Sequence, residues 1–89
     1  MVFKMNNVFD LHYDAGHSWL KVPLKLLTKL KLNNKISECS YKRGSNAFLE
    51  CDCDMPLFIE ALKSIGSDLS FNDVNNGDNS PIRTYRRFN

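Results

Sequence analysis

Apolar residues in the first third of the chain follow a strand pattern and then a helix pattern. Residues 8–13 mix β-branched, aromatic and polar side chains, and the turn signal at residues 14–16 follows them. They predict a strand that pairs with residues 17–22 as a hairpin. Residues 23–31 begin with a proline and repeat leucine at helical spacing, which predicts a helix over these residues, with the asparagine pair 33–34 supplying its left-handed end.

The middle of the chain repeats this order of elements. Residues 36–43 and 47–51 predict two strands around a short glycine-containing turn. Asp52 or Asp54 can cap a second helix, which has a proline in its first turn and an apolar stripe. Gly66 is placed to end this helix.

The last part of the chain is more polar. Residues 69–71 predict a short strand, and residues 72–80 predict a mobile polar loop. Residues 81–89 predict an edge strand or an arm. The predicted order of strands and helices indicates a single α+β domain, residues 1–89. Its predicted fold is one four- to five-stranded, mainly antiparallel sheet with both helices on one face, in the order ββαββα(β).

Length and composition limit the kinds of function. The 89 residues are 43% hydrophobic and 25% charged, which fits one small core and leaves little stability for a deep active-site cavity. Residues 1–7 lack the apolar stretch of a secretory leader, and no run of about 20 apolar residues is present. We therefore expect a cytoplasmic protein in a bacterial host cell, with no membrane partner.

Cysteine and histidine suggest chemistry only weakly. Three cysteines are an odd number, and a disulfide between Cys51 and Cys53 would be strained, so free thiols are expected. A zinc site from His12, His17 and the Cys51-x-Cys53 pair has poor spacing. A nucleophilic arrangement of Cys53, His17 and Asp52 lacks any recognisable motif. We predict no enzyme activity, no metal site and no cofactor.

Charge is segregated along a chain whose formal net charge is only +2. Residues 21–35 carry lysines without an acid, residues 50–60 carry acids without a base, and the C-terminus is basic again. Such segregation is typical either of a surface that orients a partner or of ordinary solvated faces.

Aromatic residues alternate with cations in two segments. Residues 41–43 read Tyr-Lys-Arg, and residues 83–87 read Arg-Thr-Tyr-Arg-Arg. Single-strand nucleic-acid surfaces and protein interfaces both use such mixtures. Trp19, next to the turn histidine His17, is either a core anchor or an interface residue.

Several strings of the sequence resemble a family of small hypothetical proteins from phages, plasmids and other bacterial mobile elements. Residues 16–23 are similar to its pattern GHGWLxVP, residues 36–44 to ISxxSYxRG and residues 49–54 to LEEDCD, with Ser18 in place of glycine and Cys51 in place of an acid. The resemblance covers roughly residues 10–66. It implies an accessory protein, and such proteins often inhibit host defence, as anti-CRISPR and anti-restriction proteins do.

Together these patterns predict a non-enzymatic inhibitor that binds a host bacterial protein, such as a CRISPR effector subunit or another defence nuclease. The alternative is a nucleic-acid-binding accessory protein that uses the lysine-rich first helix and the basic tail. A homodimer is a further alternative. The residues expected to contact the partner are His17, Trp19, Lys25, Lys29, Tyr41, Arg43, Asp52, Asp54, Arg83, Tyr85, Arg86 and Arg87.

Overall fold

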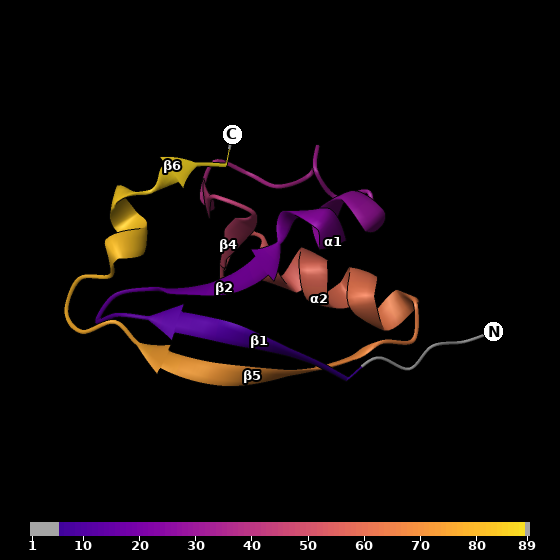
Figure 1. Cartoon of the computed structure of the whole chain (residues 1–89), viewed down its shortest axis with the longest axis horizontal. Helices are drawn as coiled ribbons and strands as arrows, with labels where there is room; N and C mark the ends of the chain where they lie inside the picture. Colours follow the sequence, from indigo (N-terminus) through magenta and orange to yellow (C-terminus); the bar gives the residue numbers. More distant parts are fainter. Residues whose placement is uncertain (1–5, 89) are drawn as a thin grey trace.

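The fold is one six-stranded sheet with two helices, as the computed structural model shows (Figure 1). The structure describes residues 6–88. Residues 1–5, which entered the argument against a secretory leader, and Asn89, the end of the predicted arm, lie outside the described part. In chain order the elements are β1 (Asn6–Tyr13), β2 (Ser18–Pro23), α1 (Leu24–Lys29), β3 (Tyr41–Arg43), β4 (Asn46–Glu50), α2 (Met55–Ser64), β5 (Asp68–Asn75), the 3₁₀ helix η1 (Pro81–Thr84) and β6 (Arg86–Arg87).

The α+β class is confirmed, whereas the predicted sheet of four to five mainly antiparallel strands is wrong. The strand order is β5-β1-β2-β4-β3-β6, and β5 pairs with β1 in parallel. The cause is the connection through α2. A helix that crosses back over the sheet makes β5 run parallel to β4, and β4 runs parallel to β1 because both are antiparallel to β2.

The main core lies between the helices and one face of the sheet. Leu20 and Val22 of β2 and Leu49 of β4 are fully buried there. Leu27 of α1 and Phe58 of α2 pack against the same cluster, so both helices cover this face. The one-sided apolar stripes of the two helices therefore led to the correct layer arrangement.

A second, smaller core lies on the opposite face of the sheet. Trp19 and Phe48 are buried beneath Ile82 of η1, with Tyr41 and Tyr85 packed at the margin. Residues one position apart in a strand face opposite sides, so Trp19 belongs to this core while Leu20 belongs to the main one. The C-terminal segment thus packs on the apolar side chains of the second core and is not a free arm.

Three element boundaries differ from the predicted ones. The strand expected over residues 36–43 is limited to β3, because Ser37 and Ser40 bind the carboxylate of Asp54 instead of a neighbouring strand. The predicted loop 72–80 is shorter, because β5 continues to Asn75 along the whole of β1. The segment after residue 80 is η1 followed by the two-residue β6.

The first helix ends at Lys29, and the left-handed residue after it is Lys31, not one of the predicted asparagines 33–34. Lys31 adopts a positive φ of 60°, and the N–H of Leu32 donates to the carbonyl of Leu27 at 2.9 Å. This Schellman-type ending turns the chain so that Leu32 enters the main core, where it is 4% exposed. Lys31 takes the left-handed conformation because this turn of the backbone brings Leu32 into the core.

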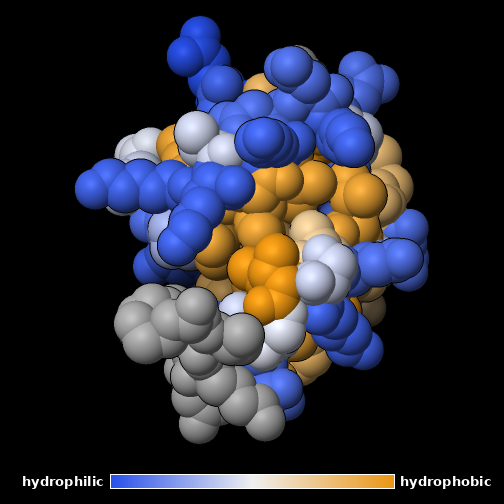
Figure 2. All heavy atoms as spheres, turned by 90° about the vertical axis from the view of Figure 1, so that its right-hand side faces the viewer, coloured by the Kyte–Doolittle hydropathy of each residue, from blue (hydrophilic) through white to orange (hydrophobic). Residues whose placement is uncertain are grey.

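The surface carries apolar side chains at the end of the molecule where α2 ends. Figure 2 looks onto that end and shows apolar atoms in the centre with hydrophilic side chains around them. Ile65, just after α2, is 51% exposed. Within residues 6–88, neither helix has the length and apolar character needed to cross a membrane.

Candidate partner-binding surface

The two segments that mix aromatic residues with cations become neighbours in the fold. β3 pairs with β6 in antiparallel register, with Tyr41 opposite Arg87 and Lys42 opposite Arg86. They are separated by more than forty positions in the sequence, and the pairing places both at one edge of the sheet. We call the cations gathered there the basic edge: Lys42, Arg43, Arg83, Arg86 and Arg87.

Aromatic rings hold several of these cations in place. The guanidinium of Arg43 lies 4.9 Å from the centre of the Tyr85 ring, and that of Arg87 lies 5.3 Å from the centre of the Tyr41 ring. The Arg87 guanidinium also donates to the carbonyl of Glu38 at 2.8 Å. Cation–π contact restricts a long side chain without neutralising its charge, so the edge is both ordered and positive.

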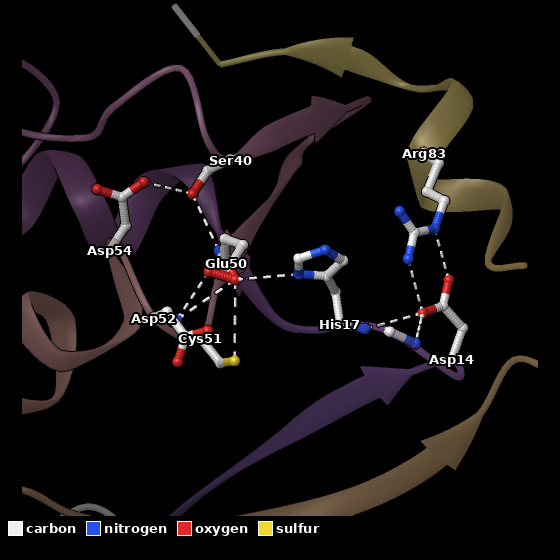
Figure 3. Close-up of polar contacts among 9 residues, drawn as sticks. Asp14, His17, Ser40, Glu50, Cys51, Asp52, Asp54 and Arg83 are labelled. Carbon is white, nitrogen blue, oxygen red and sulfur yellow. Dashed lines mark hydrogen bonds and ion pairs between the residues drawn. The ribbon is translucent and has the colours of Figure 1, made fainter.

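Arg83 is fixed by a carboxylate on the first hairpin turn (Figure 3). Its Nε and Nη2 atoms donate to the two carboxylate oxygens of Asp14 at 2.7 and 2.9 Å. The same carboxylate accepts from the backbone N–H groups of Gly16, His17 and Ser80. The hydrogen bond from Arg83, then that from Ser80, holds the pKa of Asp14 well below its usual range. Asp14 therefore ties η1 to the turn between β1 and β2.

A hollow of about 330 Å³ adjoins the basic edge. Its walls combine aromatic rings, thiols and charges of both signs, from the residues His17, Trp19, Cys39, Tyr41, Glu50, Cys53, Arg83 and Arg87. His17 and Trp19, at the start of β2, therefore line the same hollow as the C-terminal arginines Arg83 and Arg87. Arg83 is one of these lining residues, and its guanidinium lies 5.2 Å from the centre of the Trp19 ring.

Glu50 is the buried acid of this hollow. Its carboxylate accepts the backbone N–H of Asp52 at 2.8 Å and faces Nδ1 of His17 at 3.8 Å (Figure 3). Its own N–H donates to Oγ of Ser40 at 3.0 Å. The contacts to Asp52 and Ser40 stabilise the turn from β4 into α2. The imidazole of His17 is half exposed.

Cys53, the nucleophile considered from the sequence, is not activated in this arrangement. Cys53 and His17 do line the same hollow. A hydrogen bond with Cys39, and partial burial after it, raise the pKa of Cys53 to about 12. Reactive cysteines show the opposite shift, because the thiolate is the attacking species.

Metal-ligating groups do not gather around the histidines. In the described part of the chain, the ligand atoms of Glu50, Cys51 and Asp52 lie within 4.8 Å of one another, and no such trio includes His12 or His17. The N–H of Asp52 and the thiol of Cys51 already bind the Glu50 carboxylate as part of the local turn. The mixed His/Cys set considered from the sequence is not assembled by this fold.

Some residues predicted to contact a partner lie away from the basic edge or are buried. Trp19 is 2% exposed and belongs to the second core. Asp54 is 3% exposed, and both its oxygens accept from Ser37 or Ser40, so its role is structural and not that of a surface contact. Asp52 is exposed beside the hollow, whereas Lys25 and Lys29 lie on α1, apart from β6 (Figure 1).

Sequence reasoning missed the residues that organise this surface. Asp14 and Glu50 were considered only as a turn residue and as part of an acidic run. Their roles depend on Arg83 and on Ser40, which are distant in sequence, so no local pattern marks them. The one usable signal was that the aromatic-basic mixture occurs twice.

Comparison with protein-family models, with curated proteins and with solved structures finds no match to this chain. The functional argument therefore rests on the geometry described above.

Proposed function

We propose that this chain is a non-enzymatic binding protein whose basic edge contacts an acidic surface of another protein. The observation that carries the proposal is the pairing of β3 with β6, which gathers cations from two distant segments on one edge. Arg83 has a carboxylate partner, Asp14. Among residues 6–88, no carboxylate lies within ion-pair distance of Arg43, Arg86 or Arg87.

Arginines without a carboxylate partner of their own suit a binding partner that presents carboxylates. Arginine forms paired hydrogen bonds with carboxylates, and it is enriched at the centres of protein interfaces. Because Tyr85 and Tyr41 already restrict Arg43 and Arg87, less side-chain entropy is lost when a partner binds them. The hollow beside the edge is large enough to receive a side chain of that partner.

The resemblance to small proteins of mobile elements suggests which acidic proteins to test first. We propose a bacterial defence protein as the partner, and among these a CRISPR effector subunit or another defence nuclease. Binding would block a functional surface by occupancy alone. This choice rests on the resemblance, whereas the place of contact rests on the geometry of the basic edge.

The test compares two charge reversals of equal size. The edge variant carries Arg43→Glu, Arg86→Glu and Arg87→Glu, and the control carries Lys25→Glu, Lys29→Glu and Lys35→Glu, on and just beyond α1. Tagged proteins capture partners from nuclease-treated bacterial lysate, and the recovered proteins are quantified by mass spectrometry. We expect the edge variant to lose a specific partner by at least about tenfold and the control to keep it.

Two results would contradict the proposal. One is equal recovery of every partner by the edge variant and the wild-type protein. The other is loss of the partner by the control alone, which would move the interface to α1. Circular dichroism of both variants ensures that only folded proteins are compared.

Direct nucleic-acid binding is the second candidate, because phosphates also pair with arginine. The aromatic rings of the edge are not open for base stacking, since Trp19 is buried and Tyr85 lies under Arg43. Binding would then depend on phosphate contacts and would weaken steeply with salt. A gel-shift series across salt concentration measures this, and no shift at low salt would eliminate the candidate.

A homodimer stays a prediction. Light scattering coupled to size-exclusion chromatography decides it directly. The mass of a monomer at every concentration would contradict it.

A further inference from the structure

Two of the three cysteines, Cys39 and Cys53, come from different loops and line the same hollow. Cys39 lies in the loop before β3, Cys53 lies in the turn between β4 and α2, and both thiols line the hollow beside the basic edge. The sequence pointed instead to Cys51 and Cys53, whose separation by one residue disfavours a bond between them. The fold therefore creates a thiol pair that spacing along the chain does not indicate.

Asp54 holds the two segments together. Its Oδ1 accepts the backbone N–H of Ser37 at 3.1 Å, and its Oδ2 accepts the hydroxyl groups of Ser37 and Ser40 at 2.8 and 2.5 Å. These serines flank Cys39, and Asp54 follows Cys53 directly. One buried carboxylate thus fixes the backbone on both sides of Cys39 against the residue next to Cys53.

Cys39 and Cys53 line the same hollow, whereas the thiol of Cys51 has Glu50 as its partner. The hydrogen bond between the two thiols is the main cause that raises the pKa of Cys53. Cys51 places its Sγ 3.8 Å from Oε2 of Glu50. Because Cys39 is partly exposed and Cys53 is exposed, a small reagent can reach the pair from solvent.

We propose that Cys39 and Cys53 form a reversible intramolecular disulfide on reaction with a small-molecule disulfide such as oxidised glutathione. The thiolate of one cysteine attacks a sulfur of oxidised glutathione, which forms a mixed disulfide and releases one glutathione thiolate. The thiolate of the other cysteine then displaces the second glutathione. The protein loses two electrons and two protons, and two molecules of reduced glutathione are formed.

The pH dependence follows from the thiolate requirement. With its pKa raised, Cys53 is almost fully protonated at neutral pH, so the step that needs its thiolate is slow there. Oxidation is therefore expected to accelerate as the pH rises from about 7 to about 9.

The test maps the disulfide in the intact folded protein after incubation with oxidised glutathione. Trypsin cuts after Lys35, Lys42, Arg43 and Lys63, so Cys39 falls in the peptide 36–42 while Cys51 and Cys53 share the peptide 44–63. We expect these two peptides to be joined in the wild-type protein and in Cys51→Ser. Cys53→Ser and Cys39→Ser should instead stop at a stable glutathione adduct.

The outcomes separate the fold-directed pair from unspecific oxidation. A cross-link that survives in Cys53→Ser but is lost in Cys51→Ser would overturn the assignment, and so would wild-type protein that yields only adducts or disulfide-linked dimers. Repeating the reaction in denaturant should remove the preference for Cys53 over Cys51, because Asp54 no longer holds the loop. These readouts require no partner, so they stand apart from the proposed function.

Discussion

At the scale of single residues, Asp14 connects three separate parts of the chain. It is an acid in a hairpin turn, yet its carboxylate binds the turn, Ser80 and Arg83 together. A buried carboxylate is stable only when its oxygens are satisfied, and here a guanidinium and backbone N–H groups satisfy them. The position of Arg83 on the basic edge therefore depends on a residue from the opposite end of the sequence.

Replacement of Asp14 by asparagine tests this role through pH. The folded-state pKa of Asp14 lies below the unfolded value of about 3.9, so its stabilisation is present above that value and is lost as the pH falls below it. We expect Asp14→Asn to lower Tm at neutral pH. The difference between variant and wild-type protein should shrink at about pH 3. Thermal melts followed by circular dichroism measure both, and a constant difference across pH would contradict the assignment.

At the scale of elements, α2 packs on the main core through two buried side chains, Phe58 and Leu62. Phe58 is fully buried, and its ring meets the ring of Phe9 edge to face with centroids 5.3 Å apart. Because α2 also connects β4 to β5, its docking brings the last long strand to β1. Loss of this contact therefore affects both the layer of helices and the edge of the sheet.

The matched pair Phe58→Ala and Leu57→Ala measures the contribution of this contact. Removing the Phe58 ring leaves a cavity in the main core and should lower the free energy of unfolding by about 3–5 kcal/mol. Leu57 is 36% exposed, so its truncation should cost about 1 kcal/mol or less. Urea unfolding gives both values. Similar losses for the two variants would show that the Phe58 ring does not anchor α2 to the main core.

At the scale of the whole molecule, the sheet separates two cores of unequal size. The main core under the helices contains most buried apolar residues, whereas the second holds Trp19, Phe48 and Ile82. The second core depends on the C-terminal segment and on the Asp14 contact to it. The basic edge is consequently attached to the less extensive core, where local opening costs less than global unfolding.

A single substitution in η1 should open the second core and leave the first intact. Ile82 is 1% exposed, and Ile82→Asp would bury a charge unless the segment detaches. Trp19 is the only tryptophan, so its fluorescence should shift to longer wavelength and become more accessible to acrylamide. Thr84→Asp, at an exposed position of the same element, serves as the control. Loss of helical circular dichroism together with the fluorescence change would show instead that the two cores unfold as one.

Local pattern predicted the elements well and the candidate surface only in part. The first hairpin, both helices and the strand at residues 46–50 followed from alternation, helical spacing and turn residues. Tyr41, Arg43 and the C-terminal arginines were chosen for composition, and the structure places them side by side. Asp54 is the N-cap residue of α2, as one of the two predicted caps, but it is buried and not the surface contact that was expected. A sequence does not show whether a carboxylate has serine partners in another loop.

Hydrophobic periodicity determined which segments are helices and strands, since burying one face requires a fixed spacing of apolar residues. Which strands become neighbours was decided only by the tertiary structure. The parallel pairing of β5 with β1, the contact of β3 with β6 and the approach of Cys39 to Cys53 all join segments that lie far apart in the sequence. Such contacts depend on the packing of α2 and η1 against the sheet, which local spacing does not encode.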